Sequence, residues 1–211
     1  KIKLPKKKIF KDTVILNDAR KLINFDDYDI LVELIGGDKG VAKDIVMNAL
    51  KKKKHVVTAN KALISKQWKN INYISKVNNC LIKYEAAVAG GVPIIKIIDE
   101  FLISNKISRI YGILNGTSNF ILTKMLTTEK NFNEILKEAQ KLGYAEADPT
   151  FDIDGIDTAH KLSILSSLAF NVDSELDEIK TEGIRNIDLL DLKFADSLGY
   201  KIKLLGISEI E

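Results

Sequence analysis

A crowded run of acidic residues is the part of this sequence most suited to chemistry. The stretch GYAEADPTFDIDGIDTAHK, residues 143–161, carries five carboxylates and then ends in a histidine and a lysine. Carboxylates this close repel one another, so something should hold them together. Three explanations are open: a metal-binding loop, a binding site for a cationic substrate, and a turn exposed to solvent. The acids are Glu146, Asp148, Asp152, Asp154 and Asp157.

The calcium-loop pattern does not fit this stretch. With Gly155 at the sixth position of an EF-hand loop, Asp152 and Asp154 fall at the third and fifth positions. The first position is then a threonine, and the twelfth is Lys161, where a bidentate glutamate is required. Zinc is also disfavoured, because the two histidines of the chain lack the spacing of zinc ligands.

Asp157 and Lys161 are four residues apart, so on a helix they would share one face. A surface ion pair with this spacing contributes only about 0.2–0.5 kcal/mol. In a binding site, the carboxylate would instead tune the lysine to pass a proton. The other acids would then hold a cationic group such as a substrate ammonium. The spacing alone leaves both explanations open.

Strands and helices alternate over the first half of the chain. Residues 30–35, ILVELI, are an apolar run closed by two glycines, which is typical of a buried parallel strand. This alternation predicts an α/β fold with a doubly wound parallel sheet. The expected strands are 30–35, 55–59 and 81–88, and the expected helices are 39–53 and 61–77.

The pattern changes after about residue 104 and predicts an α+β second half. One expected helix is capped by Asn131 and stopped by Gly143, with apolar residues on one face. The other expected helices end near 125 or cover 157–170 and 188–198, and the expected strands are 107–114, 178–184 and 200–207.

Three loops are expected at one edge of the parallel sheet. Ligands of such sheets bind beyond the carboxyl ends of the strands, where Gly36 and Gly37, TANK at 58–61 and EAAVAGGVP at 85–93 all fall. One such loop is usually an ordinary turn, but three together predict a crevice. Lys61 starts a helix, where a cation is unfavourable unless an anionic ligand or carboxylate lies nearby. A solvated surface lysine is the alternative.

Composition narrows the classes of function. The chain of 211 residues is 45% hydrophobic, so it can bury a substantial core. Its net charge of +3 argues against a nucleic-acid surface, and the run Lys51–Lys54 fits the C-terminus of a helix. No apolar run suits a membrane span, and Cys80 is the only cysteine, placed as a buried apolar residue. We therefore expect a cytoplasmic protein without membrane or nucleic-acid partners.

Several segments resemble the homoserine dehydrogenase family. HVVTANKALIS, YEAAVAGGVPII, GILNGTSNFILTKM and GYAEADPTFDIDGIDTAHKLSIL are similar to its successive signature segments, in the same order, over most of residues 30–170. The resemblance implies that L-homoserine and NAD(P)⁺ interconvert with L-aspartate 4-semialdehyde and NAD(P)H, on the route to threonine, methionine and isoleucine. It also implies a partial Rossmann-type nucleotide domain at residues 1–103. Residues 104–211 would form an α+β domain that binds homoserine and makes a homodimer.

The resemblance implies roles for individual residues. Lys161 corresponds to the catalytic lysine that exchanges a proton with the substrate oxygen, with Asp157 beside it, and Lys61 lies between nicotinamide and substrate. The implied substrate-binding residues are Glu146, Asp152, Asp157, Asn115, Gly116 and Thr117. The implied cofactor-binding residues are Gly36, Gly37, Asn60 and Lys61. A monovalent cation, sodium, would be held by Glu85 and the backbone carbonyls of Val88, Gly90 and Val92.

The sequence also departs from the family. The family opens with a strand and a G-x-G-x-x-G turn that holds the pyrophosphate, whereas the glycines here begin at Gly36. The position that distinguishes NAD from NADP belongs to the same missing unit. We therefore expect a fragment that turns over little by itself. The alternatives are a non-catalytic binding or dimerisation module, which the presence of Lys61, Asp157 and Lys161 disfavours, and a related amino-acid dehydrogenase, which the full acidic string disfavours.

Overall fold

The first half of the protein holds the predicted parallel sheet. The computed structural model describes residues 13–172 and 176–210. Its strands are β1 (Ile30–Glu33), β2 (His55–Thr58) and β3 (Ile82–Lys83), with β2 in the middle. β1 and β2 pair in a register that places Ile30 beside His55, and all pairs are parallel. A short 3₁₀ helix that the sequence did not predict, η1 (Ala19–Asn24), precedes the sheet.

Two helices connect these strands and form the first core. α1 (Val41–Lys51) packs on β1 and β2 and against α2 (Lys61–Val77). α2 begins at Asn60, whose side chain accepts a hydrogen bond from the N–H of Leu63 and so satisfies one free donor of the first turn. Apolar residues at helical spacing face the sheet. The core includes Val46, Leu50, Val56, Leu63, Ile64 and Ile71.

The third expected strand, 81–88, is wrong in length. Only two residues pair in β3, and the chain then forms a 3₁₀ turn, η2 (Glu85–Ala87). The reason is a contact with a later segment, because the Glu85 carboxylate accepts the N–H groups of Ile95 at 2.9 Å and Lys96 at 3.0 Å. These bonds turn the chain towards α3 (Ile94–Lys96), which continues into a π-helical turn, η3 (Ile97–Phe101).

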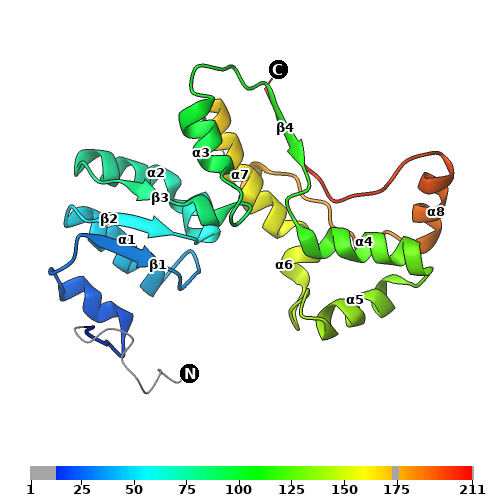
Figure 1. The fold of residues 1–211 in the computed structure, drawn as a ribbon, viewed down its shortest axis with the longest axis horizontal. Helices are drawn as coiled ribbons and strands as arrows, with labels where there is room; N and C mark the ends of the chain where they lie inside the picture. Colours follow the sequence, from blue (N-terminus) through cyan, green and yellow to red (C-terminus); the bar gives the residue numbers. More distant parts are fainter. Residues whose placement is uncertain (1–12, 173–175, 211) are drawn as a thin grey trace.

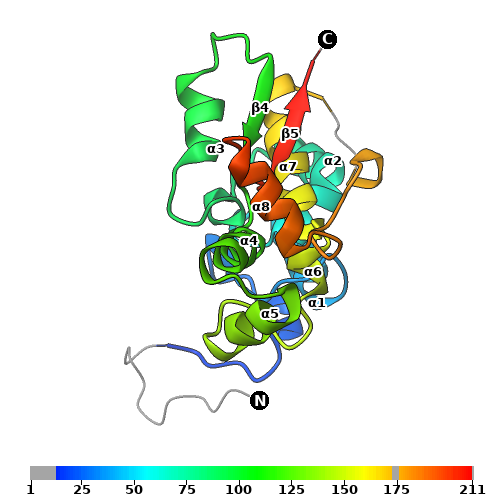
Figure 2. The same cartoon turned by 90° about the vertical axis from the view of Figure 1, so that its right-hand side faces the viewer.

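The second half is α+β, as predicted. β4 (Arg109–Gly112) and β5 (Gly206–Glu209) form an antiparallel pair and lie side by side in Figure 2. Asn131 caps α5 in a reciprocal capping box with Glu134. A second core gathers Ile121, Leu122, Met125, Ile135 and Ile153. The helices are α4 (Gly116–Thr128), α5 (Phe132–Lys141), α6 (Thr150–Ile153), α7 (Ile156–Phe170) and α8 (Leu189–Ser197), with a 3₁₀ helix η4 (Leu176–Glu178).

Two expected strands of this half are wrong. The region 178–184 forms no strand, and within 200–207 pairing begins only at Gly206. The first region is held by a close backbone contact, in which Ile184 donates its N–H to the Ile153 carbonyl at 2.8 Å. A Cβ added at Gly183 would lie 2.5 Å from that same oxygen, so this approach requires glycine.

Helix α7 joins the two halves. Figure 1 shows it between the parallel sheet and the group formed by α4, α5 and α8. Its C-terminal part adds Ile164 and Leu165 to the first core, and it packs along α2. Its N-terminal turn, which carries Asp157 and Lys161 on one face, is thereby fixed beside the start of α2.

Other sequence predictions concern smaller features. The lysine run 51–54 lies at the C-terminal end of α1, as predicted, and Lys52 donates to the Ile23 carbonyl at 2.7 Å. Cys80 is buried, also as predicted. Within the described parts of the chain, no helix combines the length and apolar character needed to cross a membrane.

Candidate active site

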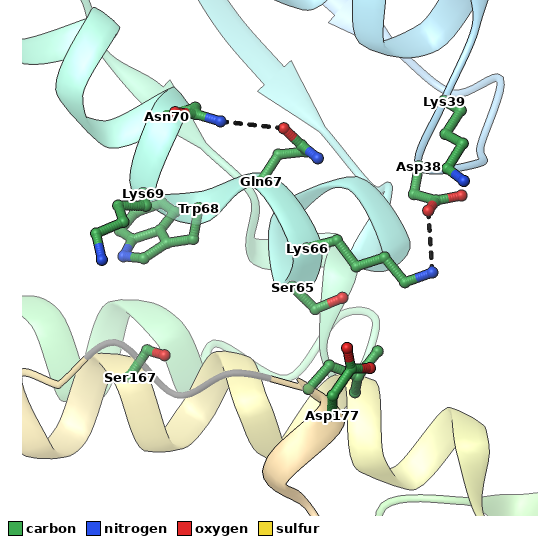
Figure 3. Close-up of a pocket in the computed structure, with 11 residues that line it drawn as sticks. Asp38, Lys39, Ser65, Lys66, Gln67, Trp68, Lys69, Asn70, Ser167 and Asp177 are labelled. Atoms are coloured by element: carbon green, nitrogen blue, oxygen red, sulfur yellow. Dashed lines mark hydrogen bonds and ion pairs between the residues drawn. The ribbon is translucent and has the colours of Figure 1, made fainter.

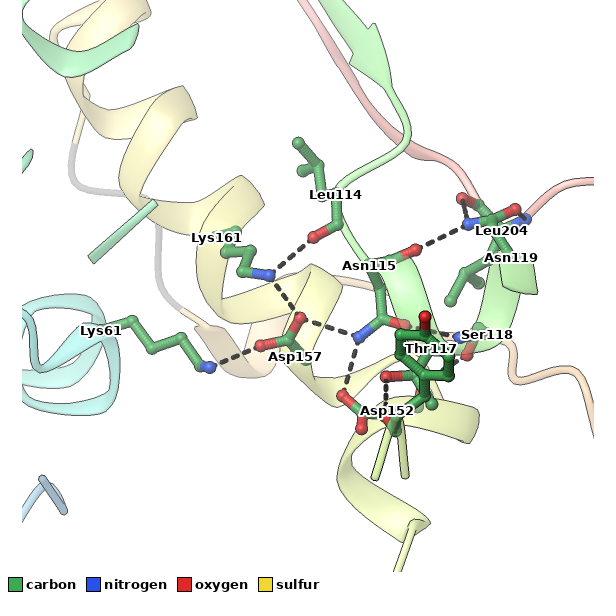
Figure 4. A network of polar contacts seen from close by, with 11 residues as sticks. Lys61, Leu114, Asn115, Thr117, Ser118, Asn119, Asp152, Asp157, Lys161 and Leu204 are labelled. Carbon is green, nitrogen blue, oxygen red and sulfur yellow. Dashed lines mark hydrogen bonds and ion pairs between the residues drawn. The ribbon is translucent and has the colours of Figure 1, made fainter. Parts of the chain in front are cut away.

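Asp157 is the centre of a charged network built from both halves of the chain. Its Oδ1 lies 2.6 Å from Nζ of Lys61, at the start of α2. Its Oδ2 lies 2.6 Å from Nζ of Lys161, one turn further along α7. Figure 4 shows the two lysines reaching the carboxylate from different helices. One buried anion therefore holds two cations that are distant in sequence.

The position of Asp157 is favourable for a carboxylate. It lies in the first turn of α7, where the helix dipole stabilises an anion. Burial raises the pKa of this carboxyl, but hydrogen bonds from Lys161, Lys61 and Asn115 outweigh burial and lower its pKa below the ordinary value. Asp157 is therefore ionised at neutral pH.

Among the residues that the structure describes, the partners of Lys161 leave one ammonium hydrogen for a ligand. Its side chain is 18% exposed, and Nζ also donates to the Leu114 carbonyl at 2.7 Å. A lysine ammonium has three donors, and Asp157 and Leu114 use two of them. Sequence reasoning missed Leu114, because a backbone carbonyl leaves no mark in the residue type.

Lys61 occupies the place where a cation needs a nearby anion, and Asp157 provides it. Its side chain is 32% exposed, and its Nζ also lies 5.4 Å from the centroid of the Phe151 ring. A cation over an aromatic face gains a modest attraction, so Phe151 is a second support for Lys61. The sequence did not single out Phe151.

Asn115 connects the network to a second carboxylate. Its Nδ2 donates to Asp152 Oδ1 at 2.8 Å and to Asp157 Oδ2 at 2.9 Å. Its Oδ1 accepts the Ser118 N–H at 2.8 Å, which caps α4. One amide thus separates two acids that would otherwise repel each other and also begins a helix.

The Asn115→Ala variant should lose more stability than loss of a helix cap explains. We expect its free energy of unfolding to fall by about 2–3 kcal/mol, because removing a cap costs about 1 kcal/mol and the two carboxylates also lose a buried hydrogen-bond donor. Urea unfolding of the full-length protein measures this. Asn131→Ala is the matched control, since Asn131 caps α5 at an exposed position. Equal losses in both variants would contradict the bridging role.

The remaining residues predicted for the substrate lie at different distances from the network. Gly116 is the first residue of α4, beside Asn115, and the Thr117 hydroxyl donates to the Tyr144 carbonyl at 2.8 Å. Glu146 is exposed in the loop after α5, with its backbone carbonyl accepting a hydrogen bond from Gln140.

The two acids without a predicted chemical role have structural partners. Asp148 accepts the N–H of Thr150 at 3.1 Å, and Asp154 pairs with Arg185. Both contacts stabilise the loop around α6, the short helix that carries Asp152. Both acids therefore contribute to the structure of this loop.

The loops expected to hold the cofactor are joined to each other. Gly36 and Gly37 have φ values of +86° and +87°, and a Cβ at either would meet nothing within 4 Å, so their backbone is open. The Asn60 side chain donates to the Gly37 carbonyl at 2.8 Å. Sequence reasoning missed Glu33, whose Oε1 accepts the Gly36 N–H at 2.9 Å. The signal was an acid inside the apolar run ILVELI.

Glu33 also ties this loop to the neighbouring strand. It is buried, and its Oε2 accepts a hydrogen bond from the Thr58 hydroxyl at 2.5 Å. The same hydroxyl accepts the N–H of Asn60 at 3.0 Å. The ends of β1 and β2 are therefore held in one hydrogen-bonded unit that positions Asn60 and Lys61.

The residues suggested for a monovalent cation lie on one turn. Both Glu85 oxygens accept backbone N–H groups, and the Val92 carbonyl accepts the N–H of Ile94 at 2.8 Å. Gly90, between Val88 and Val92, has a φ of +58°. Each of these oxygens retains a second lone pair, so the donor set is compatible with a cation.

His160 gives a pH-dependent contribution to stability. Burial lowers its pKa below the ordinary 6.5, and Lys66 and Lys61 lower it further, against Asp157 and Asp38, which raise it. At pH values well above 6.5 the ring is neutral in both folded and unfolded states. Below it, the unfolded state binds the proton more readily, so stability falls as the pH falls.

We therefore expect the free energy of unfolding to decrease between about pH 7.5 and pH 5.5, the range in which an unperturbed histidine titrates. Urea unfolding of the full-length protein across this range measures it. His160→Asn should remove this part of the slope, whereas His55→Asn should retain it. A slope unchanged by His160→Asn would refute the assignment.

Comparison with known proteins identifies the family. Residues 93–211 match the family model described as homoserine dehydrogenase, and residues 1–85 match the model of the homoserine dehydrogenase NAD-binding domain. The homoserine dehydrogenase of Neisseria gonorrhoeae is 46% identical over 202 residues, which cover 96% of this chain and 46% of that protein.

Solved structures similar to this chain are also homoserine dehydrogenases. The homoserine dehydrogenase of Thiobacillus denitrificans is 49% identical with a TM-score of 0.88, over 92% of this chain and 44% of that one. A hyperthermophilic archaeal homoserine dehydrogenase in complex with NADPH is 30% identical with a TM-score of 0.79, over 95% of this chain and 59% of that one. The chain spans less than half the length of its curated relative from Neisseria. It belongs to the homoserine dehydrogenase family.

Proposed function

We propose that the full-length protein containing this chain is an NAD(P)-dependent homoserine dehydrogenase, which interconverts L-homoserine and L-aspartate 4-semialdehyde. The observation that carries the proposal is the contact of buried Asp157 with Lys61 and Lys161, at 2.6 Å each. Membership of the family supports the choice of reaction. The same intact network disfavours a module that only binds or dimerises.

Lys161 is the residue proposed to move the proton. Its remaining ammonium hydrogen can donate to the aldehyde oxygen of L-aspartate 4-semialdehyde as that oxygen becomes a hydroxyl. In the reverse direction, the neutral amine accepts the hydroxyl proton of homoserine. Asp157 stabilises the ammonium form, and the Leu114 carbonyl fixes its direction.

The substrate amino group needs anions, and the acidic stretch supplies them. Asp152 lies beside the network through Asn115, so it is proposed to bind the substrate ammonium. Glu146, Gly116 and Thr117 complete the proposed substrate-binding set, with Asp157 contacting both substrate and lysines. The Glu146 side chain is exposed and so is accessible to a substrate.

A nicotinamide cofactor, when bound, supplies or accepts the hydride. The residues proposed to hold it are Gly36, Gly37, Asn60 and Lys61. Two features fit this role. The backbone of the two glycines is open, so a ligand can approach it closely, and the hydrogen bond from Asn60 to Gly37 holds this loop beside the start of α2. The archaeal relative was solved in complex with NADPH, and for this protein either NADP or NAD is proposed.

Further proposals follow from the family. Sodium is proposed at Glu85 and the carbonyls of Val88, Gly90 and Val92. A division into residues 1–103 and 104–211, a homodimer, a cytoplasmic location and a place in threonine, methionine and isoleucine synthesis also stay predictions. Helix α7 adds Ile164 to the first core, so the two proposed domains would share a packed boundary.

The test is an assay of the full-length protein with L-homoserine and either NAD⁺ or NADP⁺, followed by the absorbance of the reduced nicotinamide. We expect turnover with homoserine and none with L-serine, whose hydroxyl lies one carbon closer to the amino group. Absence of turnover with both cofactors, in a protein shown to be folded, would refute the proposal.

A further inference from the structure

Helices α2 and α7 meet through two parallel contacts. Lys61 and Ser65 are four residues apart on α2, and Asp157 and His160 are three apart on α7, so each pair shares a helix face. The first contact is the ion pair between Lys61 and Asp157. The second joins Ser65 Oγ to His160 Nδ1 at 2.6 Å, across 95 residues of sequence. This second contact has no part in the proposed chemistry.

The hydrogen bond between Ser65 and His160 is supported by the burial of the His160 ring. His160 is only 4% exposed, and its ring packs on Phe151 with 5.3 Å between centroids. The same Phe151 ring lies beside the Lys61 ammonium, so the two contacts are also linked to each other. Figure 3 shows Ser65 on the side of α2 that faces α7, at the wall of a cavity of about 490 Å³.

Lys61 by itself is poorly constrained. Its side chain is one-third exposed, and a long lysine side chain has many rotamers to lose when it is held in one geometry. Its distance to Asp157 depends on how α2 lies along α7. The hydrogen bond between Ser65 and His160, one turn away, restricts sliding and rotation between the helices. Lys61 therefore has fewer side-chain positions relative to Asp157.

We propose that Ser65 and His160 are positioning residues for the reaction, because their hydrogen bond sets the register of α2 on α7 and so holds Lys61 against Asp157. This inference rests on the proposed dehydrogenase function. It assigns no chemistry to either residue. Both act through Lys61, which the geometry places between the nucleotide-binding half and the charged network.

The first test compares two serine variants of one helix in the full-length protein. Each of these two hydroxyl groups donates to a carbonyl of its own helix: Ser65 to the Ala62 carbonyl at 3.3 Å, and Ser75 to the Asn72 carbonyl at 2.9 Å. Of the two, only Ser65 also bonds to His160. We expect Ser65→Ala to lower kcat about tenfold with KM for homoserine nearly unchanged, since a small misplacement of a catalytic group is costly. Ser75→Ala should match the wild type.

A conservative exchange at His160 separates positioning from packing. His160→Asn keeps a polar atom near the place of Nδ1, whereas His160→Leu fills space without a hydrogen bond. We expect His160→Asn to retain more of the wild-type kcat than His160→Leu. If both lose the same activity, the ring serves packing alone and the proposal is wrong.

The decisive measurement is a double-mutant cycle that combines Ser65→Ala with Lys61→Ala. If Ser65 acts through Lys61, adding Ser65→Ala to Lys61→Ala should change kcat by less than about twofold. The same tenfold loss in both backgrounds would overturn the proposal. The urea midpoints of the four proteins give a readout without activity, and the double variant should shift less than the sum of the singles. An inactive wild type would refute the proposed function alone, and additive midpoint shifts would refute this inference.

Discussion

Turnover by the full-length protein should fall by about 10²–10⁴-fold when Lys161 is replaced by alanine, because the reaction loses its general acid and base. KM for homoserine should change much less, since Asp152 and Asn115 remain. The measurement is steady-state kinetics in both directions of the reaction. Because the equilibrium constant is unchanged, kcat/KM should fall by the same factor in both directions. In reduction of the aldehyde, the lost group is the ammonium hydrogen that Asp157 and Leu114 leave unused.

Two further variants define what Lys161 does. Lys161→Arg keeps the positive charge, but a guanidinium does not give up its proton at neutral pH, so this variant should remain impaired. Lys141→Ala removes an exposed lysine at the end of α5 and should leave kcat unchanged. Near wild-type turnover in Lys161→Ala would assign the proton to another group and remove the central step of the proposed mechanism.

The second large effect is expected at Asp157. Asp157→Asn leaves the two ammonium groups of Lys61 and Lys161 side by side without their shared anion. Because a buried ion pair that loses one partner is strongly destabilised, we expect the free energy of unfolding to fall by about 3 kcal/mol. Turnover should also fall by about 10²-fold or more, because both lysines lose their orientation.

The matched control for this variant is Asp154→Asn. Asp154 lies on the same segment and also forms an ion pair, with Arg185, but the side chains are 34% and 47% exposed. Exposed pairs contribute about 0–1 kcal/mol, so this variant should stay close to the wild type in stability and turnover. Urea unfolding and steady-state kinetics of both variants measure these differences in stability and turnover. A loss at Asp154 as large as that at Asp157 would mean that the whole loop, rather than the buried carboxylate, is responsible.

Local patterns predicted much of this fold. The apolar face of α5 and its cap at Asn131 act within a few residues, so they are visible in the sequence. The shared helix face of Asp157 and Lys161 is of the same kind. Where helical periodicity and capping agree, the sequence predicts the element.

The errors arose where long-range contacts override local preference. Residues 178–184, EIKTEGI, were expected to form a strand, yet a backbone bond to Ile153 and the close approach of Gly183 hold them as an irregular segment. β3 is short because Glu85 turns the chain towards α3. Neither contact is visible in the local pattern.

In the site too, local spacing predicted some contacts and long-range packing determined the others. The pairing of Asp157 with Lys161 follows from spacing, but the arrival of Lys61 at the same carboxylate requires that α2 dock on α7. Sequence reasoning did not assign Glu33, Leu114 and Phe151, since each makes a hydrogen bond or ring contact with a distant segment: Glu33 with Thr58, Leu114 with Lys161 and Phe151 with Lys61. The resemblance to the family supplied the roles that spacing could not.

Gly183 has a consequence for surveys of mutational tolerance. A side chain at this position would strike the main chain of Ile153 and Asp154, so nearly every substitution should reduce the amount of folded protein. In a library scored by growth, Gly183 and Lys161 would be depleted alike, although one touches only backbone and the other handles the proton. Scoring cellular abundance beside growth would separate them, because Lys161 variants should accumulate and Gly183 variants should not.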